Sequence, residues 1–202
     1  MALIKLSNNG VKNITSVGSV GTGDLVFISK QTASSSASIS FTSGIDSTYK
    51  EYIFYFNNIH PATNGSKLTF NYSTDSGSNY NVTKTSTTFR PFHYENDSAT
   101  ELAYNTSNDL AQSTAFQPLC ENQGNNNDDS ASGYLHLFNP SSTTFVKHWI
   151  SSVNICHNAS FPASVNWFTA GYGNTTSAVD AIQFKMDSGN IDSGDILLYG
   201  VN

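Results

Sequence analysis

The sequence predicts an all-β protein, an antiparallel β-sandwich of jelly-roll-like type with an extended N-terminal arm. Many short segments alternate apolar and polar side chains, which is the period of a half-buried strand. Ser, Thr, Asn and Gly separate these segments, and such residues favour turns and disfavour helix interiors. The chain of 202 residues is 38% hydrophobic and 12% aromatic, enough to build one packed core.

The N-terminal residues, 1–24, are expected to form a docking arm, followed by a sandwich domain over residues 25–202. The arm is rich in Gly, Ser and Asn and has neither a helical nor a sustained strand period. A frayed terminus is the alternative interpretation of this composition. The candidate docking contacts are the scattered apolar residues of the arm: Leu3, Ile4, Leu6, Val11 and Ile14.

The first expected strands follow the arm closely. DLVFIS is a short apolar run, and in SASISFTSG the side chains of Ile39 and Phe41 fall on one face. EYIFYFNNI comes next and is apolar on both faces. KLTFNYS returns to alternation, with Leu68, Phe70 and Tyr72 on one side.

The later expected strands are more varied. NVTKTSTTFRPF is weaker, and Pro91 places it at a sheet edge or at a strand end, because proline cannot donate to the ladder. GYLHLFN sets Leu135 and Leu137 against aromatic neighbours, and FVKHWISSV is again apolar on both faces before VNWFTAGYG. The closing AIQFKM and ILLYGV segments are predicted to pair as a terminal hairpin.

Two segments do not have a strand pattern. Residues 98–112 are the best helical candidate, but their Ser, Thr and Asn content predicts one or two turns at most. Residues 121–132, ENQGNNNDDSAS, are too polar to pack and are expected to form a loop that projects outward or is mobile.

A strand that is apolar on both faces needs cover on its second face, since monomers rarely expose large apolar patches. A neighbouring copy of the chain is the favoured cover, so the sequence predicts a homo-oligomer, with a trimer favoured. Internal cover by the long loops between Thr83 and Ser132 is the alternative. The candidate subunit contacts come from the two doubly apolar segments: Ile53, Tyr55, Phe145 and Trp149.

Charge and cysteine content restrict the function classes. The net charge is −6, and no basic run exists, so the sequence does not predict nucleic-acid binding. No stretch approaches the roughly 18 apolar residues of a membrane helix, so no membrane insertion is expected. The first residues have no export-signal pattern, so synthesis and folding in a cytoplasm are expected. Cys120 and Cys156 are then expected to stay reduced and buried, and a disulfide between them is the alternative.

No motif predicts catalysis, a metal site or a cofactor. The five histidines lack ligand spacing, and neither a nucleophile elbow nor a phosphate-binding loop occurs. Asp128–Asp129 and the acids within Asp187–Asp195 are oxygen ligands of the kind calcium takes, but solvated turn acids are favoured. A sugar-cleaving enzyme that uses Glu95 and Glu101 is the alternative function, because glycosidases use paired carboxyls. The candidate glycan contacts are aromatic residues in turn-rich segments: Tyr80, Phe92 and Tyr94.

Three segments resemble virion structural proteins of marine bacteriophages: ASISFTSGIDSTYKEYIFYFNNIHPAT, YLHLFNPSSTTFVKHWISS and NTTSAVDAIQFKMDSGNIDSGDILLYGV. The opening ALIKLSNNGVKNIT is similar to the starts of phage tail-fibre and particle proteins. The resemblance implies a virion location, a β-sandwich and no active site. It also implies other virion proteins as partners, in either tail-fibre-like attachment or capsid decoration, and a protein of this kind is expected to contact host surface glycans or proteins.

Overall fold

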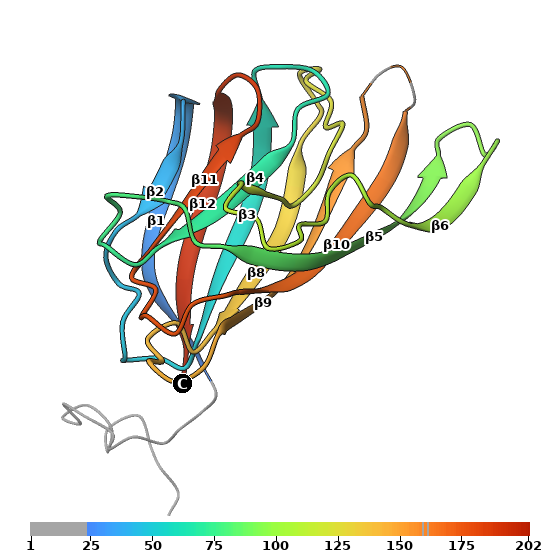
Figure 1. Ribbon diagram of the computed structural model, residues 1–202. Coiled ribbons are helices and arrows are strands. Elements are labelled where there is room, and N and C mark those ends of the chain that lie inside the picture. The colour runs from blue at the N-terminus through green and yellow to red at the C-terminus, as the bar shows by residue number, and fades with distance from the viewer. Residues whose placement is uncertain (1–23, 159, 161) are drawn as a thin grey trace, which may run out of the picture.

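The computed structural model describes residues 24–158, 160 and 162–202, and the regular structure of this part is all β-strand (Figure 1). The prediction of an all-β antiparallel sandwich is therefore confirmed. The arm contacts Leu3, Ile4, Leu6, Val11 and Ile14 lie outside the described residues. In chain order the strands are β1 (Leu25–Ser36), β2 (Ile39–Phe41), β3 (Glu51–Pro61), β4 (Leu68–Ser73), β5 (Lys84–Tyr94), β6 (Thr100–Tyr104), β7 (Gln117–Pro118), β8 (Ala131–Phe138), β9 (Lys147–Cys156), β10 (Ala163–Gly173), β11 (Ala181–Met186) and β12 (Ile191–Val201).

Two sheets of unequal width pack on each other. The larger sheet has eight strands in the order β1-β12-β3-β8-β9-β10-β5-β6, and the smaller has four in the order β2-β11-β4-β7. Every pairing between these strands is antiparallel. The small sheet packs on one face of the large sheet, and the core lies between them (Figure 1). The other face of the large sheet has no second sheet of the described residues over it.

An aromatic cluster joins the two sheets. The ring of Phe184 in β11 lies 5.3 Å from the rings of Phe54 and Phe56 in β3. Phe70 in β4 meets Trp149 in β9 edge-on at 5.0 Å. Each of these side chains is at most 1% exposed, and full burial of a Phe side chain contributes up to about 3 kcal/mol to folding.

Strand β3 resolves how one strand can be apolar on both faces. Tyr52, Phe54 and Phe56 are at most 1% exposed and point into the core. Ile53 and Tyr55, on the other parity, point away from the small sheet. The second apolar set therefore belongs to the uncovered face of the large sheet.

The outward side of the small sheet is different, because loops cover it through hydrogen bonds. Thr69, Asn71 and Ser73 of β4 are polar and at most 3% exposed. The Asn71 amide donates to the main-chain oxygens of Tyr80 and Thr114, both at 2.9 Å. Loops therefore cover the small sheet, whereas the doubly apolar strands β3 and β9, for which internal loop cover was the alternative, belong to the large sheet.

The predicted terminal hairpin is wrong. β11 pairs with β2 and β4 in the small sheet, whereas β12 pairs with β1 and β3 in the large one. The short connection between Met186 and Ile191 therefore carries the chain from one sheet to the other. Local alternation predicts that both segments are strands, but it does not identify their partners.

Pro91 lies neither at a sheet edge nor at the end of its strand. β5 continues to Tyr94, and β6 pairs beside it, with Leu102 opposite Pro91. The pairing of β5 with β10 skips from Phe89 to Phe92. The missing donor of proline therefore falls in a gap of the ladder, where it disrupts little.

Two predicted loop regions also differ from expectation. Residues 98–112 contain strand β6, in place of helical turns. In the polar loop at 121–132, Gln123 is fully buried, and its amide donates to the main-chain oxygen of Ile59. This loop packs against the protein because its polar groups find hydrogen-bond partners.

Candidate functional site

The uncovered face of the large sheet concentrates exposed apolar side chains, and we call it the outer apolar face. Eight large hydrophobic residues in the described part of the chain are classed as exposed, and seven lie on this face by strand parity and register. Such contiguous patches mark interaction surfaces more often than free surface. The seven residues are Leu25, Phe27, Phe89, Leu102, Tyr104, Tyr134 and Ile150.

Two rows of paired residues cross this face from the edge strand β1, one as far as β5 and the other to the opposite edge at β6. One row runs Phe27, Tyr199, Ile53, His136, Ile150, Ala170 and Thr87. The other runs Lys30, Leu197, Tyr55, Tyr134, Ser152, Phe168, Phe89 and Tyr104. Directly paired residues share a face, so these rows place the apolar side chains of the outer strands side by side.

Ring contacts within the rows hold the outer side chains in place. Tyr199 meets Phe27 at 5.5 Å and Tyr55 at 5.7 Å, both edge-on. Phe89 and Phe168 stack at 5.0 Å with an interplanar angle of 14°. The aromatic surface is therefore preorganised, which lowers the entropy lost when a partner binds.

A shallow hollow of about 500 Å³ lies along the same face. Small residues of β5 and β10, including Thr87 and Ala170, line it. The larger side chains of Phe138, Ile150 and Tyr172 line it as well. A hollow with apolar walls accepts a protruding apolar side chain from a partner.

The four predicted subunit contacts have different locations. Tyr55 is half-buried on the outer apolar face, as expected for a contact. Ile53 shares the face but is only 5% exposed, because Tyr199 and His136 flank it on the neighbouring strands. It therefore has little area to offer to a partner.

Trp149 as a subunit contact is wrong. Its side chain is 1% exposed and packs on Phe70 in the core. Its neighbour Ile150, which is 51% exposed, occupies the outer face instead. Phe145 is 67% exposed, but it lies in the connection ahead of β9 and outside the two rows.

The predicted glycan contacts fall into two separate places. Phe92 and Tyr94 line one small pocket near the end of β5, together with Arg90. Tyr80 lies in the loop between β4 and β5, where its hydroxyl group is buried and its main-chain oxygen accepts from Asn71. Only Phe92 and Tyr94 are therefore brought together.

The two carboxylates of the alternative enzyme both belong to the β5–β6 hairpin. Glu95 is exposed in the turn, and Glu101 is exposed in β6 opposite Phe92. Asp97 of the same turn accepts from His93 at 2.9 Å, and both side chains are exposed. This hairpin leaves its acids open to solvent.

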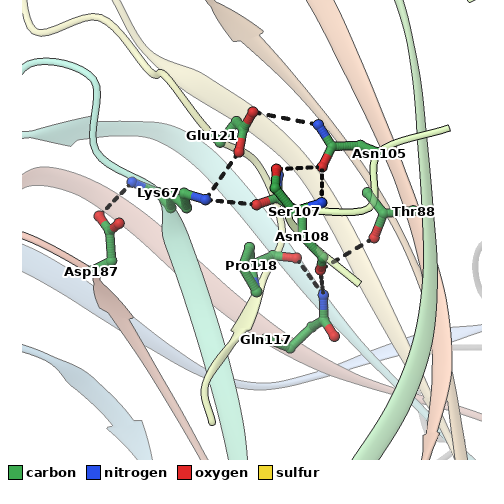
Figure 2. Close-up of polar contacts among 9 residues, drawn as sticks. All are labelled: Lys67, Thr88, Asn105, Ser107, Asn108, Gln117, Pro118, Glu121 and Asp187. Atoms are coloured by element: carbon green, nitrogen blue, oxygen red, sulfur yellow. Dashed lines mark hydrogen bonds and ion pairs between the residues drawn. The ribbon is translucent and has the colours of Figure 1, made fainter. Parts of the chain in front are cut away.

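A polar network of hydrogen bonds and one ion pair links the 105–121 segment to the sheets (Figure 2). The Lys67 ammonium lies 3.0 Å from a Glu121 oxygen and donates to the Asn108 side-chain oxygen at 2.8 Å. The Gln117 amide donates to the main-chain oxygen of Asn108, also at 2.8 Å. Asn108 and Gln117 are at most 1% exposed, so this network is part of the packed structure.

Two lysines are fully buried without a carboxylate partner among the described residues. The Lys84 ammonium donates to the Asn71 side chain at 2.6 Å and to the Val82 main-chain oxygen at 2.8 Å. Burial lowers its pKa to about 7. Burial also lowers the pKa of Lys147, which donates to the main-chain oxygen of Phe145 at 2.7 Å.

The cysteines and acidic loops have separate surroundings. Cys120 is buried as expected, but the expected burial of Cys156 is wrong, because this residue ends β9 with its side chain exposed. The two thiols are free. Asp187 accepts from the Lys67 main-chain nitrogen, and Asp195 accepts from Lys30. Residues 24–158, 160 and 162–202 contain no group of three acidic, His or Cys side chains arranged to hold a metal ion. In the same residues no helix is long and apolar enough to cross a bilayer.

Sequence reasoning did not single out Ile150 or Arg90. Ile150 and Trp149 are adjacent in a segment that has apolar residues on both parities, so alternation alone left the exposed parity open. Arg90 is the only arginine of the chain, and this singular composition is a signal in the sequence that points to it.

Comparisons with protein-family models, with curated proteins and with solved structures find no match for this chain.

Proposed function

We propose that this chain is a non-enzymatic structural protein of a bacteriophage particle that associates with copies of itself through the outer apolar face. The observation that carries the proposal is the placement of seven exposed large apolar side chains on one sheet face. Removing such side chains from water is the main driving force of protein association. The resemblance of three segments to marine phage virion proteins supports the location on a particle.

A second copy of the chain fits the size of this face. Eight strands of 5 to 12 residues, spaced about 4.8 Å apart and rising about 3.3 Å per residue, give a face on the order of 1,200 Å². A stable protein interface buries about 800 Å² on each partner. The face therefore has the area that one self-complementary contact needs.

The symmetry follows from how the face is used. A face that packs against the same face of a second copy gives a two-fold dimer. The trimer favoured from the sequence requires the face to meet a different surface of the next copy. The two arrangements predict masses of two or three times 21.8 kDa.

Light scattering on the purified full chain tests self-association. We expect a mass that is a multiple of 21.8 kDa and that falls to one copy in Ile150→Asp, because a buried unpaired carboxylate opposes association. Ser47→Asp adds the same charge in the exposed loop between β2 and β3 and is the matched control. A wild-type chain that is monomeric at micromolar concentration contradicts the proposal.

The location on the particle needs its own experiment. Deletion of residues 2–20 is expected to remove the protein from tails if it is tail-fibre-like, and from capsids if it is a decoration or head-fibre protein. Labelled antibody on intact particles reads out either result. Retention of the truncated protein on both structures contradicts the role of the arm as the anchor.

A further inference from the structure

The only arginine of the chain lies in an unusual setting. Arg90 is on β5, and Phe92, two residues further, is paired with the buried Val165 of β10. Residues two apart share a face of a strand, so Arg90 and Phe92 lie on the same face as Val165. Arg90 is thus on the core side of the large sheet and not on the outer apolar face.

Two aromatic rings hold the Arg90 guanidinium. Its central carbon lies 5.0 Å from the centre of the Phe92 ring and 5.4 Å from that of Trp167. Among the residues that the structure describes, none forms an ion pair or a side-chain hydrogen bond with it. Its five N–H donors are therefore unused, although the rings fix the orientation of the group.

The guanidinium is part of a pocket of about 220 Å³. Phe92, Tyr94, Asn122 and His157 also line this pocket. No carboxylate of the described residues lines it, although Glu101 is paired with Phe92 on the neighbouring strand and is exposed. The described residues from 24 onward have seven lysines and arginines against fifteen acids. A cation with free donors in a concave site of an otherwise acidic protein attracts an anion.

The side chains that line the Arg90 pocket indicate which chemical class of ligand it binds. A guanidinium fork matches the two oxygens of a carboxylate. The rings of Phe92 and Tyr94 offer apolar faces to the C–H groups of a sugar, since the face of an aromatic ring is its negative side. The Asn122 amide supplies both a donor and an acceptor for hydroxyl groups.

We propose that the Arg90 pocket binds the carboxylate of an acidic sugar in a host surface glycan. Arg90 holds the carboxylate, and Phe92 and Tyr94 pack on the sugar ring. The inference rests on the tail-fibre-like version of the proposed function, in which the protein attaches the particle to its host, and it names a ligand for that attachment. The binding site and the outer apolar face use opposite sides of the large sheet, so one molecule engages both.

The test is a titration of the isotope-labelled full chain with glucuronic acid and with N-acetylneuraminic acid, followed by NMR. The chain has two tryptophans, and we expect the indole signal of Trp167 to shift. The signal of Trp149, buried against Phe70, is the internal control and stays in place. The methyl esters of the same sugars, which lack the charge, are the matched ligands and are expected to bind more weakly.

Variants separate the guanidinium from the fold. Arg90→Met keeps the apolar stem and is expected to weaken binding about tenfold or more, the loss of one charge-assisted contact. Arg90→Lys keeps the charge but lacks the guanidinium fork, and its affinity is expected to lie between that of the wild type and that of Arg90→Met. Lys30→Met removes an exposed cation that pairs with Asp195 and should leave binding unchanged.

Several results would overturn the inference. They are no shift of the Trp167 signal with any acidic sugar, equal affinity of Arg90→Met and the wild type, and equal affinity for acids and esters. Binding of an acidic peptide without binding of acidic sugars would overturn the ligand class. Light scattering on the same samples distinguishes this inference from the proposed function. A chain that self-associates but binds no sugar contradicts the sugar site alone and leaves the proposed self-association standing.

Discussion

The Lys84 ammonium lies 2.6 Å from the side-chain oxygen of Asn71, and both residues are completely buried. A buried ammonium usually has a carboxylate beside it, but here its described partners are two uncharged carbonyl oxygens. Burial therefore disfavours the charged form and lowers the pKa of Lys84 to about 7, from an ordinary value of 10.5.

This shift predicts that the protein becomes more stable as the pH rises from 7 toward 10.5. In that window the unfolded chain keeps the Lys84 proton while the folded chain has lost it, so folding is favoured at higher pH. The slope is up to about 1.4 kcal/mol per pH unit for one proton. Urea unfolding at several pH values measures it. Lys84→Met should flatten the slope, and a variant that keeps the full slope would show that other groups cause it.

Trp149 and Ile150 are adjacent, but truncation of their side chains should change the free energy of unfolding by very different amounts. Trp149→Ala is expected to lower the free energy of unfolding by about 3–5 kcal/mol, because it opens a cavity beside Phe70. Ile150→Ala removes an exposed side chain and should change the stability of the monomer by about 0.5 kcal/mol or less. Urea unfolding of dilute protein compares the two. Similar losses in both variants would contradict the assignment of opposite faces.

The two thiols should react at very different rates. Cys156 is exposed, whereas Cys120 is buried and its pKa is raised to about 12 by burial. The reactive form is the thiolate, so a thiol reagent at neutral pH is expected to label Cys156 quickly and Cys120 only after unfolding. Mass spectrometry of the labelled peptides gives the result. Absence of any free thiol in the native protein would instead indicate a disulfide.

The alternative enzymatic function makes a separate prediction. Incubation of the pure protein with host polysaccharide is expected to release no oligosaccharide, since Glu95 and Glu101 are both exposed on one hairpin. Release that disappears in Glu95→Gln or Glu101→Gln would establish a glycosidase in place of the binding role. Loss of release in Asp109→Asn as well would point to a general effect of charge.

The sequence predicted which segments form strands better than it predicted which strands pair with one another. Alternation placed Ile39 and Phe41 correctly in the core and put Leu135 and Leu137 on one face together, because the strand period depends only on local sequence. It did not show that β11 and β12 belong to different sheets. That outcome depends on contacts between distant segments, which a local pattern does not contain.

The candidate site was predicted only in part, for a related reason. Two apolar sets in one strand correctly indicated a second apolar face, and Tyr55 lies on it. In the run that holds Trp149 and Ile150, both parities are apolar, so the sequence did not show which one faces outward. The Arg90 pocket depends on Trp167, which is 77 residues away in the chain and is brought close only by folding.

The central claim is that the outer apolar face is buried between copies of this chain. Oxidative footprinting of the full chain at increasing protein concentration tests it most directly. We predict that Phe89, Tyr104 and Tyr134, all exposed in one copy, lose reactivity as the concentration rises. Phe145, exposed outside the two rows, should keep its reactivity. Unchanged reactivity of the three face residues at every concentration would contradict the account.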